Sequence, residues 1–257
     1  MDLISGLDEE AQTNSQAPWD KFDAKDYFSH NYRTLREDDR QILAAVRDHF
    51  GALLAASGAT GLHGLDLGAG TNLYPALAML PWCSAITLFE RAPKNVDWLR
   101  SEIQQYGTNW DEFWQVLTEH QAYQGVADPR ARLKSAADVR PGDLFTELPE
   151  GGADIGTMFF VAESLSTSYT EYRGAIDHFA RALRPGAPFA VAFMENSVGY
   201  EVGTHTFPAC KVGQSDVIDS LQGYADSDLT VSRIDVPGQP LRPGYTGMLL
   251  ALGRMRD

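Results

Sequence analysis

The sequence predicts an α/β protein built on a doubly wound, mostly parallel sheet. Two observations lead to this fold class. Short apolar strands alternate with amphipathic helices from residue 63 onward, which is typical of a parallel sheet with helices on both faces. In addition, the strand at 63–67 enters a glycine turn that opens a helix, and the next strand ends in Glu90, 22 positions after Gly68. Doubly wound nucleotide-binding folds share that arrangement.

The first 57 residues precede this alternation and form two parts. Residues 1–18 are rich in acids, Gln, Asn, Ser and Ala without an apolar period, so we expect a disordered tail. Residues 19–57 start with a segment dense in aromatic side chains and continue as a helix over 37–57, which Gly58 ends. We therefore expect one domain, 19–257, whose first part, 19–57, holds a helical lid and the first helices.

The remaining elements follow in order from apolar runs, helical periods and turn residues. The predicted strands are 63–67, 85–89, a short one ending near Val139, 153–160, 188–194, 229–236 and 246–253. The predicted helices are 72–80, 93–106, helical turns within 109–135, 169–183 and 214–225. Pro185-Gly186 closes the helix before it, because Pro cannot continue a helix and Gly takes a positive φ without strain.

Composition and charge exclude several classes of function. The chain has 257 residues, with 21 Lys and Arg against 35 Asp and Glu, a net charge of −14. Because this field repels phosphate backbones and anionic lipids, nucleic acids and membranes are poor partners. The first ten residues lack the basic and apolar regions of a secretory signal. Cys83 and Cys210 are too few for a disulfide framework. We expect a monomeric cytoplasmic protein.

The glycine turn carries the strongest chemical signal. Gly68-Ala69-Gly70 follows a strand and lets a ligand approach the backbone closely. Glu90 stands where such folds place the acid that binds ribose hydroxyls, so an adenosine-containing cofactor is indicated. A dinucleotide fingerprint requires a third glycine where this chain has Leu73, and NAD is therefore disfavoured.

Two further carboxylates lie near the expected cofactor. Asp66, two residues before the first glycine, could brace the loop or reach an amino group, and S-adenosylmethionine carries such a group. Asp138 offers an acceptor for the exocyclic amine of adenine, and Val139 an apolar surface for its ring. The expected cofactor is S-adenosylmethionine, with S-adenosylhomocysteine as its product.

Four spaced motifs resemble the nicotinamide, phenylethanolamine and thioether methyltransferases, and the resemblance runs from about Phe22 to Leu252. The motifs are Phe22-x-x-x-Asp26-Tyr27-Phe28-x-x-x-Tyr32, Gln41-Ile42-Leu43, Leu65-Asp66-Leu67-Gly68-Ala69-Gly70-x-x-x-Tyr74 and Glu90-x-x-x-x-Asn95. The resemblance implies a Rossmann-like class I methyltransferase that uses S-adenosylmethionine. It also implies a seven-stranded sheet with an antiparallel C-terminal strand, and an N-terminal lid.

The same resemblance implies site residues. Tyr27 and Tyr32 look like lid tyrosines; an aromatic core stripe is the alternative, but five residues apart they do not share a helical stripe. The implied cofactor contacts are Tyr27, Tyr32, Asp66, Gly68, Ala69, Gly70, Tyr74, Glu90, Asn95, Asp138, Val139 and Phe159. The implied acceptor contacts are Phe160, Glu163, Glu195, Ser197, Tyr200 and His205. The implied catalytic residues are Glu163 and Tyr27.

Glu163 is the expected acceptor residue, either holding an N–H of the acceptor or taking its proton. Its alternative role is to cap the helix near residue 169.

Phe193 and Met194 occupy positions where some members of the family have an acid, so the resemblance does not imply which acceptor is methylated. The leading function is N-methylation of a small aromatic or amine acceptor. The alternatives are C- or O-methylation of an aromatic such as an indole, and a non-catalytic S-adenosylmethionine-binding protein. The histidines show no metal-ligand spacing, and no metal is expected.

Overall fold

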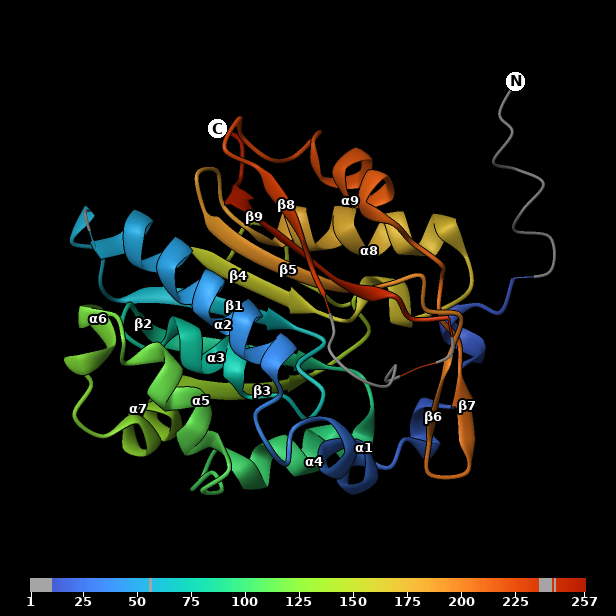
Figure 1. Cartoon of the computed structure of the whole chain (residues 1–257), viewed down its shortest axis with the longest axis horizontal. Helices are drawn as coiled ribbons and strands as arrows, with labels where there is room; N and C mark the ends of the chain where they lie inside the picture. The colour runs from blue at the N-terminus through green and yellow to red at the C-terminus, as the bar shows by residue number, and fades with distance from the viewer. Residues whose placement is uncertain (1–10, 56, 236–241, 243) are drawn as a thin grey trace.

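The computed structural model describes residues 11–55, 57–235, 242 and 244–257. Its centre is a seven-stranded sheet in the order β3-β2-β1-β4-β5-β9-β8 (Figure 1). The strands are β1 (Leu62–Leu67), β2 (Cys83–Glu90), β3 (Ala137–Pro141), β4 (Ile155–Phe159), β5 (Pro188–Glu195), β8 (Thr230–Ile234) and β9 (Gly247–Arg254). Neighbouring strands pair in parallel except at β9, which is antiparallel to both β5 and β8. The predicted fold class is confirmed.

Helices cover both faces of the sheet. The first face carries α2 (Glu37–Phe50), α3 (Tyr74–Met79), α4 (Pro93–Glu102), α5 (Trp110–Leu117), α6 (Gln121–Gln124) and α7 (Pro129–Ala136). The second carries α8 (Tyr169–Ala182) and α9 (Gln214–Leu221). Strand β5 shows how one segment serves both cores: Phe189 and Val191 face the second, while Ala190 and Ala192 face the first. The sequence of a strand that is buried on both faces is a continuous apolar run.

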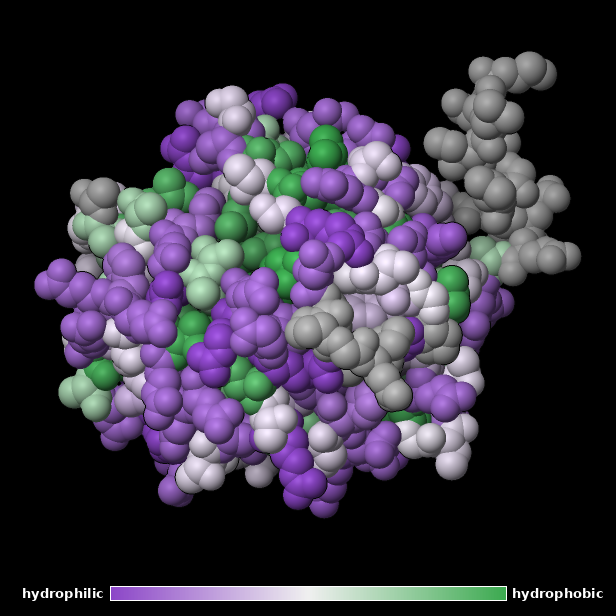
Figure 2. All heavy atoms as spheres, viewed as in Figure 1, coloured by the Kyte–Doolittle hydropathy of each residue, from purple (hydrophilic) through white to green (hydrophobic). Residues whose placement is uncertain are grey.

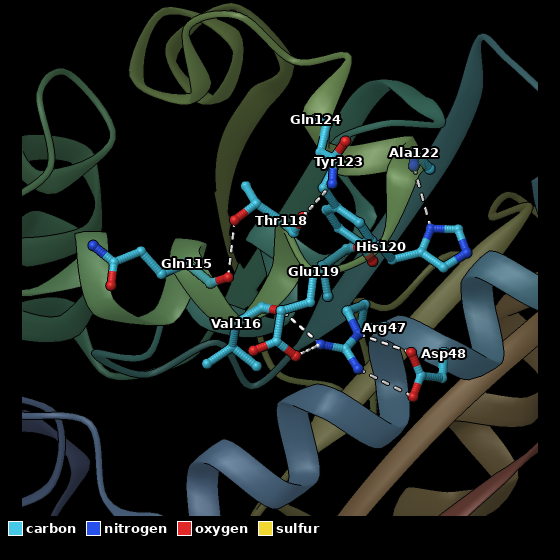
Figure 3. A network of polar contacts seen from close by, with 11 residues as sticks. Arg47, Asp48, Gln115, Val116, Thr118, Glu119, His120, Ala122, Tyr123 and Gln124 are labelled. Atoms are coloured by element: carbon cyan, nitrogen blue, oxygen red, sulfur yellow. Dashed lines mark hydrogen bonds and ion pairs between the residues drawn. The ribbon is translucent and has the colours of Figure 1, made fainter.

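Helix α2 is held to α5 by a buried cation. Arg47 donates from Nη1 to the Val116 carbonyl at 2.7 Å, pairs with Glu119, and donates from Nε to Asp48 at 2.8 Å (Figure 3). After Phe50 the chain continues as a π-helix, Gly51–Ala55, so the expected single helix over 37–57 is in fact two segments. The α-helix changes to a π-helix at Gly51, where a Cβ would lie 2.5 Å from Nε2 of the His120 ring.

The N-terminal part differs from the sequence expectation. It contains three short helices, η1 (Asn14–Gln16), η2 (Trp19–Lys21) and α1 (Ala24–Asn31). The expected disordered tail over 1–18 is wrong for its described half, because Gln12 accepts from the Thr167 amide at 3.0 Å and the Asn14 amide donates to Glu171 at 2.7 Å. These partners lie more than 150 positions away, so no local period reveals them. Residues 1–10 lie outside the described residues.

A small hairpin, β6 (Tyr200–Val202) with β7 (His205–Phe207), was also absent from the expectation. It contacts the N-terminal segment, since the Gly203 amide donates to Asp26 at 2.8 Å and Phe207 packs against Phe22. The face shown in Figure 2 is largely hydrophilic, with hydrophobic groups in smaller patches. None of the helices in the described part of the chain has the length and apolar run needed to span a bilayer.

Candidate active site

A cavity lies at the carboxyl ends of β1, β2 and β4, the edge where doubly wound folds bind ligands. It holds about 730 Å³ of space free of atoms, part of which is open to solvent. Ten of the residues expected in the site line it: Tyr27, Tyr32, Gly68, Ala69, Gly70, Glu90, Asn95, Phe159, Phe160 and Tyr200. The sequence signal and the cavity therefore coincide along the sheet edge.

The glycine turn forms the floor of this cavity. Gly68 and Gly70 have φ angles of 69° and 57°, in the left-handed region that favours glycine. A Cβ on Gly68 would lie 2.5 Å from a methyl carbon of Val161, another lining residue. Glycine is thus required at position 68 both by its backbone angles and by the close approach of the segment after β4.

Glu90 braces the turn from the end of β2. Its Oε2 accepts from the Gly70 amide at 2.8 Å, and its Oε1 accepts from the Ala92 amide at 2.7 Å and from Asn95 at 3.4 Å. Burial raises the pKa of Glu90, and these hydrogen bonds offset part of that rise. The carboxyl group is therefore fixed beside the cavity by the same loop that binds the ligand in folds of this class.

Three buried polar atoms around the turn have no hydrogen-bond partner. They are Thr71 Oγ1, Asn72 Nδ2 and Asn95 Oδ1, and all three residues line the cavity. Buried polar atoms are nearly always paired in folded proteins. This end of the cavity therefore presents donors and acceptors suited to a polar ligand.

The N-terminal segment forms part of the cavity lining. Asn14, Trp19, Phe22, Tyr27 and Tyr32 all line it. The Tyr27 ring lies 6.1 Å from that of Tyr32, and Asp23 caps α1 by accepting from two backbone amides. The two tyrosines thus come from α1 and its C-terminal end, and both line the cavity.

Glu163 lies behind the cavity wall in the short helix η4 (Ala162–Ser164), between the lining residues Val161 and Ser164. Its side chain is fully buried; Oε1 accepts from the Met194 amide at 3.0 Å, and Oε2 has no partner. Desolvation raises the pKa of Glu163 to about 7. The alternative role as a helix cap is wrong, because the cap of α8 is Ser168.

Four expected cofactor contacts do not line the cavity. Asp66 is buried beside Thr157, whose hydroxyl donates to it at 2.8 Å, and burial raises the pKa of Asp66 to about 8. The Tyr74 hydroxyl donates to Asp39 at 3.0 Å inside the first core. Asp138 is exposed on β3 and Val139 is buried in the core.

Asp143 and Leu144 line the cavity where Asp138 and Val139 were expected. The correction has a topological cause, since β3 continues to Pro141 and the chain reaches the cavity only after it turns at Gly142. Asp143 is held there by Arg91 at 2.8 Å.

Besides Glu163, three expected acceptor contacts lie outside the cavity lining. Glu195 accepts from Arg233 at 2.8 Å and from Thr246 at 2.7 Å. Ser197 is fully buried with an unpartnered hydroxyl, and His205 is half-buried at the start of β7. Among the expected acceptor contacts, the cavity thus brings together Phe160 and Tyr200. Phe160 has a φ of 61°, a strained angle for a residue with a side chain.

Sequence reasoning missed Arg242, which is 6% exposed. Its Nη1 donates to Ser164 Oγ at 2.9 Å and its Nη2 to the Tyr27 hydroxyl at 2.8 Å, while the guanidinium lies 4.0 Å over the Tyr200 ring. No periodic signal in the sequence marks this arginine.

Comparison with known proteins agrees with this architecture. A family model described as the NNMT/PNMT/TEMT family matches residues 10–242. A search of curated proteins found no match. Among the residues that the structure describes, no group of three His, Cys, Asp or Glu side chains is arranged to hold a metal ion.

Several solved structures share the fold at low sequence identity. An S-adenosylmethionine-dependent methyltransferase from Clostridium acetobutylicum matches with a TM-score of 0.55 and 10% identity, over 91% of this chain and 100% of that one. A second such enzyme, from Methanosarcina mazei, matches with a TM-score of 0.52 and 12% identity, over 76% of this chain and 92% of that one. The N-methyltransferase NodS from Bradyrhizobium japonicum, solved with S-adenosylhomocysteine, matches with a TM-score of 0.51 and 16% identity, over 86% of this chain and 89% of that one.

Proposed function

Because the chain belongs to the NNMT/PNMT/TEMT family of methyltransferases, we propose that it methylates a nitrogen of a small aromatic or amine acceptor with S-adenosylmethionine. The size of the cavity supports a small acceptor, because about 730 Å³, part of it open to solvent, is in the range of small-molecule sites. Five residues of the N-terminal segment line it together with the glycine turn and Glu90. This joint lining is the observation that carries the proposal.

The lining fits the cofactor at three points. Glu90, at the end of β2, suits the ribose hydroxyls. Thr71 and Asn72 offer unpartnered polar atoms beside the glycine turn, as the charged methionine end requires. Asp143 and Leu144 offer a carboxylate and an apolar surface for adenine, the role expected of Asp138 and Val139. The neighbour NodS, solved with S-adenosylhomocysteine, adds support.

The chain's residues have mainly to position the acceptor and exclude water. Bound S-adenosylmethionine would supply an electrophilic methyl group to the lone pair of the acceptor nitrogen, with S-adenosylhomocysteine as the leaving product. The rings of Tyr27, Phe160 and Tyr200 give the acceptor end an apolar, aromatic wall. Tyr27 acts here by orienting the acceptor.

Glu163 takes the proton that the acceptor nitrogen loses. Its free oxygen, Oε2, is the proton acceptor, and a pKa of about 7 matches the working range of a general base. Val161 and Ser164, which flank Ala162 and Glu163, line the cavity, so a water molecule between Oε2 and the acceptor nitrogen would relay the proton.

The test is a screen of amines, indoles and pyridines with isotopically labelled cofactor, with the methylated atom located by NMR. Glu163→Gln keeps the shape of the side chain and should lower methyl transfer by roughly 10²–10⁴ with unchanged affinity for S-adenosylhomocysteine. The exposed Glu150→Gln is the matched control. Full turnover in Glu163→Gln would exclude the base, and a wild-type protein that binds cofactor but methylates nothing would favour the non-catalytic alternative.

A further inference from the structure

Arg242 brings a buried positive charge to the acceptor end of the cavity. Each of its three described contacts, Ser164, Tyr27 and Tyr200, is itself a residue of the cavity wall. The guanidinium therefore lies beside the space that the proposed function gives to the acceptor.

The charge of Arg242 has only neutral partners in the described part of the chain. Ser164 and Tyr27 are hydroxyl acceptors, Tyr200 is an aromatic ring, and no ion pair among the described residues includes Arg242. Glu163 is the acidic residue whose charge acts on Arg242. Ser164 Oγ accepts from Arg242 and donates to Glu163 Oε1 at 3.3 Å, so the two charged groups are bridged by a hydroxyl and make no direct ion pair.

A buried charge without a direct ion pair is costly, and an anion bound beside the guanidinium would lower that cost. The guanidinium has five N–H groups in a planar fork, of which the described contacts use two. A fork of this kind matches a carboxylate in two-point geometry.

We propose that the methyl acceptor carries a carboxylate, which Arg242 binds. The inference rests on the proposed function and specifies its substrate class. A single negative charge suits one guanidinium, whereas the neighbouring Glu163 and the net charge of −14 disfavour a doubly charged phosphate. The rings of Tyr200, Tyr27 and Phe160 suit an aromatic body for the same acceptor.

Matched pairs of acids and amides test this assignment in the complex with S-adenosylhomocysteine. Benzoate, nicotinate and indole-3-acetate are compared with benzamide, nicotinamide and indole-3-acetamide by calorimetry. We expect at least one acid to bind roughly 10- to 100-fold more tightly than its amide, the range for a hydrogen-bonded charge pair. Arg242→Gln should abolish the difference, Arg242→Lys should keep part of it, and Arg173→Gln, an exposed site on α8, should leave it unchanged.

The results separate this inference from the proposed function. A wild-type protein that fails to bind S-adenosylhomocysteine contradicts the proposed function itself. A protein that binds it but prefers the amides, does not distinguish the pairs, or binds none of the acids overturns the carboxylate alone. If Arg242→Gln does not fold, the acid preference of the wild type and its reduction in Arg242→Lys decide the question. An acid preference that persists unchanged in both variants would also overturn it.

Discussion

Replacing Gly68 with alanine tests whether the close approach of two loops builds the cavity. The new Cβ would lie 2.5 Å and 2.8 Å from the two methyl carbons of Val161, and the backbone would keep a φ of 69°. The left-handed angle costs about 1–2 kcal/mol for a residue with a Cβ. The overlap adds roughly 1–3 kcal/mol, because the branched Val161 side chain is stiff at χ1. The total loss of unfolding free energy is about 2–5 kcal/mol.

Gly151 provides the matched control. Its φ is 64°, and nothing lies within 4 Å of the position of its Cβ. Gly151→Ala should therefore show the backbone cost alone, about 1–2 kcal/mol. Urea denaturation measures both variants, and calorimetry measures S-adenosylhomocysteine affinity, which should fall at least tenfold in Gly68→Ala only. The double variant with Val161→Ala should recover part of the stability. Equal losses at positions 68 and 151, or no recovery, would refute the argument.

Three further predictions address charge and coverage. Glu90→Gln should weaken S-adenosylhomocysteine binding by about 1.5–3 kcal/mol in calorimetry, and an unchanged affinity in a folded variant would exclude the ribose contact. The pKa of Asp66 is raised from 3.8 to about 8, so the folded protein holds a proton that the unfolded chain loses, and stability falls as the pH rises between those values. Asp66→Asn should therefore gain stability relative to wild type between pH 5 and pH 8 in urea titrations; a constant difference would contradict the buried acid. Deleting residues 2–18 should weaken S-adenosylhomocysteine binding roughly tenfold relative to deleting 2–10, because Asn14 and its contacts form part of the wall; equal affinities would show that 11–18 add nothing.

The sequence predicted the sheet because each of its strands is a local pattern. The strand before Gly68 and the strand ending at Glu90 are apolar runs bounded by turn residues, and periodicity detects such runs. The cofactor end of the cavity was predictable for the same reason, since Gly68, Gly70 and Glu90 lie at the ends of consecutive strands.

The remaining part of the site depends on contacts that no local pattern contains. Asp143 replaced Asp138 because a strand two residues longer than expected moves the next loop relative to the sheet edge. Arg242 and Tyr27 are 215 positions apart, and Asn14 meets Glu171 across 157. Single side chains in irregular segments acquire their roles only when the chain is folded, so their positions cannot be derived from spacing.

The two ends of the cavity therefore differ in how they depend on the fold. The cofactor end lies at the ends of β1 and β2, where replacing a residue such as Gly68 or Glu90 disturbs the glycine turn and the sheet itself. The acceptor end is lined from α1 by Tyr27, whose hydroxyl accepts a hydrogen bond from Arg242. A carboxylate bound at Arg242 would interact with the same guanidinium that holds Tyr27, so acceptor binding and the position of Tyr27 would be thermodynamically coupled. Substitutions at Arg242 should therefore change the acceptor while leaving the cofactor site intact.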